Sequence, residues 1–530
     1  MDHAQTAHAG DHIISKIVAL APFGVVSGQE VLDQLKASTQ ELIALFKTEG
    51  RLDQNPAALA LNRTVELHAD AARACLQGCR VMVTGGAGCV GSRLIPLLAS
   101  LGATEIAIVD IATPCSSTYS QTDGTRPTAY QVDIRDAAAL NAVFEQVKPQ
   151  VVFHLAGIRE PGRAESVVRD AIETNVFGTG NLIEACLTHG VKDAVYSSTG
   201  KCFAYISDHV YTASKKLAEA QWVAAARNSS STRFRCTRFT HIMENGLVAQ
   251  DIAQGIANGL VGLHGPDRYF NIQNLRQATH LLVNALALAK QTPPDGFWSA
   301  VDLGWPVNTL ELALYSIDQS PNHSISPAAI CFMGVPKGYD EAFFRGQFPW
   351  GDQGEYHPLI NALEAPSWFG DSTGSMVGAR AHSFTDSALE IELKKLRTNL
   401  QVTAIDMVGM KQALADAVMG LARSVFGAAE LSRLIDVLWS GAAPTWAGPY
   451  AREAERFCLV IGLLTDAVVA RISVLPGLAI TGQDRDKLMQ VCQTLLKVDR
   501  LHVHYTSLSS ALAATSLHSD PKCARALDVH

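Results

Sequence analysis

The 530-residue sequence predicts an α/β protein: a doubly wound parallel sheet with an extra helical N-terminal segment and a largely helical C-terminal region. Two observations predict this fold class. From residue 80, short β-branched runs alternate with longer helical stretches, and such alternation builds a parallel sheet that helices cover on both faces. On either side of that part, Ala- and Leu-rich stretches repeat apolar residues at helical spacing.

The alternating part defines the expected elements. Five short runs are expected to be strands, at residues 81–84, 106–109, 151–154, 194–197 and 233–238. Longer runs between and around them are expected to be helices, at residues 92–101, 137–146, 166–189 and 211–226. The chain then becomes irregular and rich in Pro, Gly and aromatic residues, and it turns helical again near residue 383.

The composition is that of an ordinary globular protein, with 48% hydrophobic and 18% charged residues. A formal net charge of −8 gives no electrostatic reason to expect a nucleic-acid partner. Because no run of about 18 apolar residues occurs, no membrane span is expected. The 11 cysteines are scattered without a zinc-site spacing, which predicts free thiols, no metal site and a cytoplasmic protein.

A glycine-rich loop follows the first expected strand and precedes the next helix. Residues 84–91 read Thr-Gly-Gly-Ala-Gly-Cys-Val-Gly. Gly85 permits a tight turn, Gly88 lets the backbone approach a pyrophosphate, and Gly91 allows close packing of the helix on the strand. Free N–H groups at the helix N-terminus would face the phosphates. This context predicts a Rossmann dinucleotide-binding site.

An acidic residue stands where such a site needs one. Asp110 ends the second expected strand, 19 residues after Gly91. Its carboxylate would accept both hydroxyls of the adenosine ribose, and it would repel a 2′-phosphate. Since no arginine follows it immediately, the cofactor is predicted to be NAD rather than NADP.

A second motif carries the expected chemistry. Tyr211-Thr-Ala-Ser-Lys215 places a phenol and an ammonium four residues apart, on one face of a helix. Lys215 would hold the nicotinamide ribose and favour the phenolate of Tyr211, which would take a proton from an alcohol while hydride leaves the same carbon. Thr199 would hydrogen-bond that oxygen. Ser197 and Ser198 are competing candidates, and all three residues could simply end a strand.

Together these residues resemble the extended short-chain dehydrogenase/reductase superfamily of NAD-dependent nucleotide-sugar epimerases and dehydratases. The nearest branch is the polysaccharide-biosynthesis group, similar to UDP-N-acetylglucosamine 4,6-dehydratases. The resemblance covers about residues 80–290. It implies NAD, a nucleotide-sugar substrate, and a homodimer formed through the helices at 166–189 and 211–226.

Further stretches carry the resemblance, among them Val132-Asp133, His154-Leu-Ala-Gly157, Asn175-Val-Phe-Gly-Thr179 and Gly265-Pro-Asp-Arg-Tyr-Phe270. By this resemblance, Lys201 joins the three catalytic candidates. The residues implied to bind the cofactor, besides those above, are Cys89, Val90, Asp133, Ile134, Leu155, Ala156, Gly157 and Asn175. The residues implied to bind the substrate are Ser198, Arg159, His241 and Arg268.

The sequence departs from the family pattern at two points. Gly200 stands where the family's "STDK" segment has the aspartate that helps expel the C6 hydroxyl, so 4,6-elimination would need another acid. Lys201 is then a base at C5, a substrate ligand or a surface lysine. The asparagine expected after Arg238-Phe239 is replaced near His241, which is a pocket group or, more simply, a core histidine.

The sequence therefore predicts an NAD-dependent enzyme that transiently oxidises C4 of a nucleotide sugar, as an epimerase or a dehydratase. A dehydrogenase with net oxidation of an alcohol, and a non-catalytic NAD sensor or scaffold, remain as alternatives. The expected domains are a helical extension (1–79), an NAD-binding domain (80–300), an irregular pocket region (301–382) and a helical domain (383–530).

Overall fold

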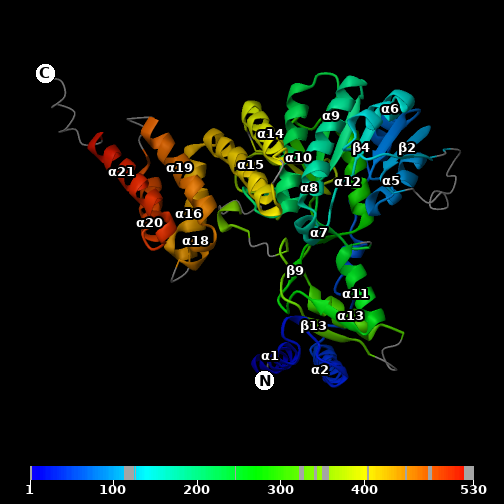
Figure 1. The fold of residues 1–530 in the computed structure, drawn as a ribbon, viewed down its shortest axis with the longest axis vertical. Coiled ribbons are helices and arrows are strands. Elements are labelled where there is room, and N and C mark those ends of the chain that lie inside the picture. The colour runs from blue at the N-terminus through cyan, green and yellow to red at the C-terminus, as the bar shows by residue number, and fades with distance from the viewer. Residues whose placement is uncertain are drawn as a thin grey trace.

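A nine-stranded sheet forms the centre of the computed structural model, in the order β14-β15-β11-β6-β5-β4-β1-β2-β3 (Figure 1). Strands β3 to β11 of that order run parallel, whereas β15 and β14 add an antiparallel edge. The strands are β1 (Arg80–Thr84), β2 (Glu105–Asp110), β3 (Pro127–Gln131), β4 (Val151–His154), β5 (Asp193–Thr199), β6 (Arg233–Phe239), β11 (Gly296–Ala300), β14 (Phe369–Gly370) and β15 (Met376–Arg380). The described residues are 3–112, 125, 127–244, 246–321, 327–339, 343–348, 357–382, 384–402, 405–447, 451–474 and 480–518.

Helices cover both faces of this sheet, and each face has its own apolar core. One face packs under α4 (Ala69–Leu76), α5 (Cys89–Ser100) and α12 (Leu275–Ala287). The other packs under α6 (Ala137–Val147), α7 (Pro161–Ser166), α8 (Val168–Ile172), α9 (Thr179–Thr188) and α10 (Val210–Asn228). The predicted doubly wound parallel sheet is confirmed.

Two local features differ from the expectation. The helix expected at 166–189 is interrupted, because residues Glu173–Gly178 form a π-helical segment (η2) between α8 and α9. Such bulges often occur at functional sites, and this one carries Asn175. The edge strand β3 was not expected because its sequence, Pro-Thr-Ala-Tyr-Gln, is polar and largely exposed.

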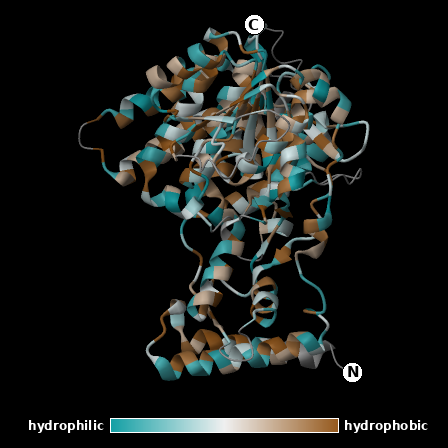
Figure 2. Ribbon diagram, turned by 90° about the vertical axis from the view of Figure 1, so that its right-hand side faces the viewer, coloured by the Kyte–Doolittle hydropathy of each residue, from teal (hydrophilic) through white to brown (hydrophobic). Residues whose placement is uncertain are grey.

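The N-terminal helices belong to a second unit, the stalk at the bottom of Figure 1. Figure 2 shows these helices lying across the base of the molecule. The backbone N–H of Ile330 donates to Oγ1 of Thr39 at 3.0 Å. Segments that precede and follow the first sheet strands in the sequence therefore build one core. Packing therefore groups the chain differently from the boundaries expected at residues 79 and 300. The stalk contains α1 (His3–Leu20), α2 (Gln29–Thr48), α3 (Ala58–Asn62), α11 (Leu247–Asn258), α13 (Thr309–Asp318), β7 (His241–Ile242), β8 (Leu260–Leu263), β9 (Tyr269–Phe270), β10 (Ile272–Gln273), β12 (Val307–Asn308) and β13 (Ala329–Phe332).

The C-terminal helices extend to one side of the sheet domain (Figure 1). Leu396, Leu414 and Val418 from this region share one continuous core with Ala171 and Leu217 of the sheet domain. The helices are α14 (Asp386–Leu400), α15 (Met407–Ala428), α16 (Leu431–Ala442), α17 (Pro444–Ala447), α18 (Arg452–Arg456), α19 (Cys458–Val474), α20 (Gly482–Leu495) and α21 (His502–His518).

This packing corrects one expectation. A homodimer was expected through the helices at 166–189 and 211–226, but α14 and α15 of the same chain pack on α8 and α10. The apolar side chains that would join two subunits there are already buried within one chain. The faces of α8 and α10 that α14 and α15 cover are therefore not available to a second subunit.

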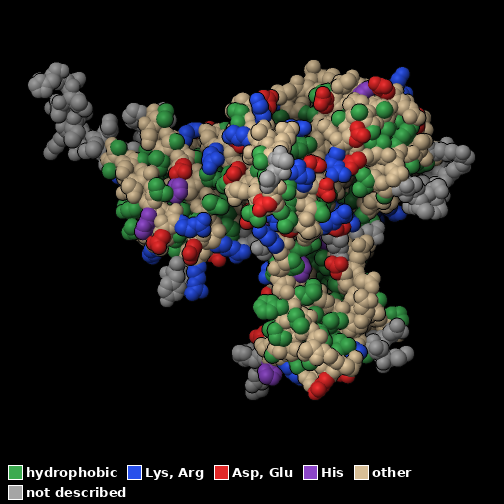
Figure 3. Space-filling view, viewed as in Figure 1, with side chains coloured by type: hydrophobic (Ala, Val, Ile, Leu, Met, Phe, Trp, Pro, Cys, Tyr) green, Lys and Arg blue, Asp and Glu red, His purple; other side chains and the backbone are tan. Residues whose placement is uncertain are grey.

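The surface carries mixed charge, and Figure 3 shows acidic and basic side chains interspersed over the face that it views. Within the described ranges, no helix combines the length and the apolar character needed to span a bilayer. Across those same ranges, no three His, Cys, Asp or Glu side chains are grouped so that they could hold a metal ion.

Candidate active site

The glycine loop approaches the end of β4 so closely that it has no room for side chains. Gly85 has a φ of +71°, and a Cβ atom there would stand 2.5 Å from the backbone nitrogen of Ala156. A Cβ at Gly91 would stand 2.5 Å from Cα of Gly86. The next helix, α5, starts after Gly88 without a side-chain cap. The loop therefore leaves a helix N-terminus open toward a phosphate group.

Asp110 closes the other side of this loop. Its Oδ2 accepts the backbone N–H of Ala87 at 3.0 Å, and its Oδ1 accepts that of Ala112 at 3.0 Å. Each carboxylate oxygen has further lone pairs, which can accept the two hydroxyls of a ribose. The glycine cradle and this carboxylate together fit a dinucleotide.

At the expected adenine end, Asp133 is held by its own neighbour. Arg135 donates to the Asp133 carboxylate from its backbone N–H, from Nε and from Nη2, at 2.9, 2.8 and 2.6 Å. Burial acts to raise the pKa of Asp133, but the hydrogen bonds and charge of Arg135 outweigh it, so the pKa is lowered. Ile134 packs against the π-helical segment at Gly178.

Asn175 fastens the turn that follows β4. Its Oδ1 accepts the N–H of Ile158 at 2.8 Å, and its Nδ2 donates to the carbonyl of Ile158 and to Oγ of Ser214. A Cβ at Gly157 would stand 2.9 Å from Oδ1 of Asn175. The π-helical segment thus brings a buried amide between the cofactor loop and α10, which carries Ser214.

His154 is a structural link rather than a charged group. Its Nδ1 lies 2.8 Å from Oγ1 of Thr84 and its Nε2 lies 3.0 Å from Oγ1 of Thr179. Burial lowers its pKa to about 3, and the charge of Lys215 adds to the effect. The neutral ring joins β1, β4 and α9 directly below the glycine loop.

The predicted catalytic residues lie at the carboxyl end of β5 and on the first turns of α10. Nζ of Lys215 donates to the carbonyl of Ser197 at 3.0 Å and lies 4.3 Å from the centre of the Tyr196 ring. Tyr211 lies one helical turn before Lys215 on α10, and Thr199 is the last residue of β5. Burial lowers the pKa of Lys215 to about 8, so its ammonium remains the main form at neutral pH.

Ser198 does not share this side of the strand. Its hydroxyl is buried and donates to Oε2 of Glu219 at 2.6 Å. Glu219 and Glu364 flank the buried guanidinium of Arg238, at 2.6 and 2.7 Å from Nη2. Strand alternation explains the difference, because side chains at 197 and 199 point to the face opposite that of 198.

Three predicted residues gather beyond the sheet edge. Burial lowers the pKa of His241 to about 4, and the charges of Arg159 and Lys201 act in the same direction, so the three lie near one another. Nε2 of His241 is buried without a hydrogen-bond partner among the described residues. Such an atom costs free energy unless a ligand or water satisfies it.

Arg268 lies in the same region of the stalk. Burial and the charge of Arg268 lower the pKa of His264, whose ring centre lies 4.9 Å from that of Tyr339, with the two rings tilted by 57°. A Cβ at Gly162 would stand 2.9 Å from the Tyr339 ring, so this loop packs against the start of α7. This contact joins the stalk to the sheet domain near His264.

Two features of the site were not foreseen. A Cβ atom at Gly200 would overlap the side chain of Leu359, which belongs to the segment after residue 356. The start of α10 is held by Glu165 from α7. No local pattern in the sequence predicts these contacts, because Gly200 and Leu359 are 159 residues apart and Glu165 and Val210 are 45 residues apart.

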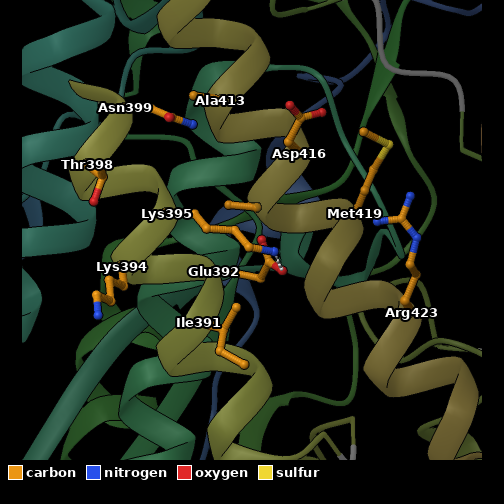
Figure 4. Close-up of a pocket in the computed structure, with 11 residues that line it drawn as sticks. Ile391, Glu392, Lys394, Lys395, Thr398, Asn399, Ala413, Asp416, Met419 and Arg423 are labelled. Atoms are coloured by element: carbon orange, nitrogen blue, oxygen red, sulfur yellow. Dashed lines mark hydrogen bonds and ion pairs between the residues drawn. The ribbon is translucent and has the colours of Figure 1, made fainter. Parts of the chain in front are cut away.

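A separate pocket of about 590 Å³ lies between α14 and α15 (Figure 4). Its wall includes Lys394 and Arg423, and Lys395 pairs with Glu392 at 2.8 Å. No residue predicted for cofactor, substrate or catalysis lines it.

The sheet order and the glycine loop define a protein with a Rossmann-like fold. Residues 81–339 match the family described as "Polysaccharide biosynthesis protein". This part of the chain is similar to that family, and the resemblance to polysaccharide-biosynthesis proteins predicted from the sequence is confirmed.

Individual relatives match over parts of their length. An uncharacterized membrane protein of Methanocaldococcus jannaschii is 29% identical over 40% of this chain and 63% of its own. The capsular polysaccharide biosynthesis protein CapD of Staphylococcus aureus is 28% identical over 44% of this chain and 39% of its own. The X-ray structure of Pen from Bacillus thuringiensis, 19% identical, gives a TM-score of 0.47 over 58% of this chain and 88% of Pen. The chain thus spans less than two thirds of the length of these two curated relatives.

Proposed function

We propose that the protein binds NAD at the glycine loop and epimerises a nucleotide-diphosphate sugar through transient oxidation at C4. One observation carries the proposal: Lys215 is anchored on the carbonyl of Ser197, which sets Tyr211 and Lys215 of one helix beside Thr199 at the end of β5. That end lies on the same sheet edge as the glycine loop, since Thr84, His154 and Tyr196 are in register.

The chain's own residues would share the work as follows. Tyr211 takes the proton of the C4 hydroxyl, and Thr199 hydrogen-bonds the same oxygen. Lys215 supplies the positive charge that favours the phenolate. NAD, held by the glycine loop and Asp110, would supply the hydride acceptor and donor for C4. Tyr211 then gives its proton back, and the cycle shows no net oxidation.

Positive groups beyond the sheet edge suit the diphosphate of such a substrate. Arg159 and Lys201 lie close enough to His241 to lower its pKa, and Arg268 does the same for His264 in the stalk. Guanidinium groups bind phosphate oxygens in pairs. The unpartnered Nε2 of His241 supports a pocket role for this residue rather than a core role.

The structure favours epimerisation over dehydration. Dehydration needs an acid to expel the C6 hydroxyl, and the family places it at the position of Gly200. Here Leu359 fills the space that a side chain at residue 200 would enter, so this position cannot carry an acid unless Leu359 moves. The relatives named for capsular polysaccharide biosynthesis support a role in making polysaccharide or glycoconjugate precursors.

The test is to incubate the purified chain and NAD with UDP-, GDP- and dTDP-hexoses in D₂O and to follow the sugars by NMR. We expect one sugar to convert to its C4 epimer without deuterium at C4, because the hydride stays on the cofactor. Loss of one water mass would show dehydration instead. Accumulating NADH would show net oxidation, and no change in any sugar would leave the NAD-sensor alternative.

A further inference from the structure

The helix that carries Tyr211 and Lys215 is not capped by its own sequence. Its N-cap residue, His209, makes no side-chain cap hydrogen bond. The N–H of Val210 instead donates to Oε1 of Glu165 at 2.8 Å. A carboxylate at a helix N-terminus satisfies an otherwise unpaired donor and favours the helix dipole. Glu165, on α7, therefore fixes the first turn of α10.

The other oxygen of this carboxylate is held by the C-terminal region. Nζ of Lys411, on α15, lies 2.6 Å from Oε2 of Glu165. The side chain of Glu165 is 7% exposed and that of Lys411 is 19% exposed. A buried carboxylate is stable only with a partner, so Lys411 holds the Glu165 side chain in place.

Further contacts tie the C-terminal helices to the same layer. The guanidinium of Arg397 lies 4.2 Å from the centre of the Phe177 ring, in the π-helical segment. At the far end of α10, Nδ2 of Asn228 donates to Oδ2 of Asp386 at 2.7 Å. The helix is thus fastened by α14 and α15 near both of its ends.

We propose that Glu165 and Lys411 are positioning residues for Tyr211, so that the C-terminal helices set the geometry of the reacting site. This inference rests on the proposed function for the role of Tyr211. Val210 directly precedes Tyr211, whereas Lys215 has a separate anchor on Ser197. Loosening the first turn therefore displaces the phenol and leaves the cofactor contact of Lys215 in place.

The test uses the full chain with Lys411→Met. We expect kcat to fall about tenfold, with KM for the sugar and the affinity for NAD within about twofold of the wild type. Backbone amide exchange of residues 210–214, measured by mass spectrometry, should become about tenfold faster. Lys411→Arg should restore both values, because it keeps the ion pair.

The matched control is Lys487→Met. Lys487 pairs with Asp436 between α20 and α16, and its side chain is 20% exposed, close to that of Lys411. This control should change neither kcat nor the exchange of residues 210–214. An equal loss of kcat in both variants would overturn the proposal.

A second variant covers the case in which Lys411→Met does not fold. Glu165→Gln with Lys411→Met removes both charges and keeps an oxygen facing Val210, so exchange at 210–214 should stay within about threefold of the wild type. Wild-type exchange in Lys411→Met, or fast exchange in the double variant, would overturn the proposal. Amide exchange is measured without substrate and does not depend on activity. A failure of the proposed epimerase activity would instead appear as no conversion of the UDP-, GDP- and dTDP-hexoses.

Discussion

Leu359 occupies the space into which a side chain at Gly200 would extend. A Cβ atom there would overlap Cδ2 of Leu359 and would stand 3.3 Å from the carbonyl oxygen of Phe239. Leu359 is itself held in place, since its carbonyl accepts from Nη1 of Arg238 at 2.9 Å and its N–H donates to Nδ1 of His357 at 3.2 Å. The turn after β5 is therefore shaped for glycine.

Gly200→Asp should lower the free energy of unfolding by about 2 kcal/mol, because Leu359 must leave its place and a carboxylate is added in a closed site. Adding Leu359→Ala should recover part of that loss, although Leu359→Ala alone is also destabilising. Urea denaturation of Gly200→Asp, Leu359→Ala and the double variant measures these free energies of unfolding. Strictly additive losses would show that the two residues do not compete for one space. NMR of the sugar product then tells whether the new acid permits loss of water.

Tyr211→Phe should lower kcat by about a thousandfold, since it removes the proton acceptor and little else. The affinity for NAD should stay within about threefold, measured by calorimetry, because Lys215 keeps its anchor. Thr212→Ser is a suitable control on the same helix. Turnover in Tyr211→Phe close to that of the wild type would assign the proton transfer to another residue.

Lys215→Met should abolish most turnover and yet stabilise the fold by about 1–3 kcal/mol at pH 7. Burial lowers the pKa of Lys215 from 10.5 to about 8. Between these values the unfolded chain binds more protons than the folded one, so wild-type stability should rise as the pH increases through this range. Thermal or urea unfolding from pH 7 to pH 10 should show this rise in the wild type and not in the variant. The same slope in both proteins would mean that another group titrates there.

The sequence was sufficient where function depends on short motifs. Gly85, Gly91 and Asp110 were assigned from their spacing together with the expected strand before the loop and the expected helix after it, and the structure joins them around one loop. Tyr211 and Lys215 follow from an i, i+4 pattern on a helix. In each case the contacts are local, or they link neighbouring strands of a sheet whose order the alternation already implies.

The remaining features depend on contacts between distant segments. Lys411 meets Glu165 across 246 residues, and Thr39 meets Ile330 across 291. No periodicity or motif marks such pairs. Ser198 was expected to bind the substrate from the family resemblance, but the pleat of β5 turns it toward Glu219.

The buried Arg238 and its two carboxylates give the last prediction. Glu219 and Glu364 both contact the guanidinium, but their pKa values move in opposite directions. Burial acts to raise the pKa of Glu219, yet the charge of Arg238 and hydrogen bonds from Arg238 and Ser198 lower it overall. For Glu364, burial outweighs Arg238 and raises the pKa.

At pH 7, Glu219→Gln should therefore cost about 3 kcal/mol of unfolding free energy, whereas Glu364→Gln should cost less than about 1 kcal/mol. The contribution of Glu219 is present above its unfolded pKa near 4.5 and is lost as the pH falls. The contribution of Glu364 to stability changes with pH in the opposite direction, because the folded chain keeps the Glu364 proton to a higher pH than the unfolded chain does. Urea unfolding of both variants from pH 4 to pH 7 should show a flatter acid limb for Glu219→Gln and less loss of stability toward neutral pH for Glu364→Gln. Equal costs at pH 7 would mean that the two carboxylates share the charge of Arg238 evenly.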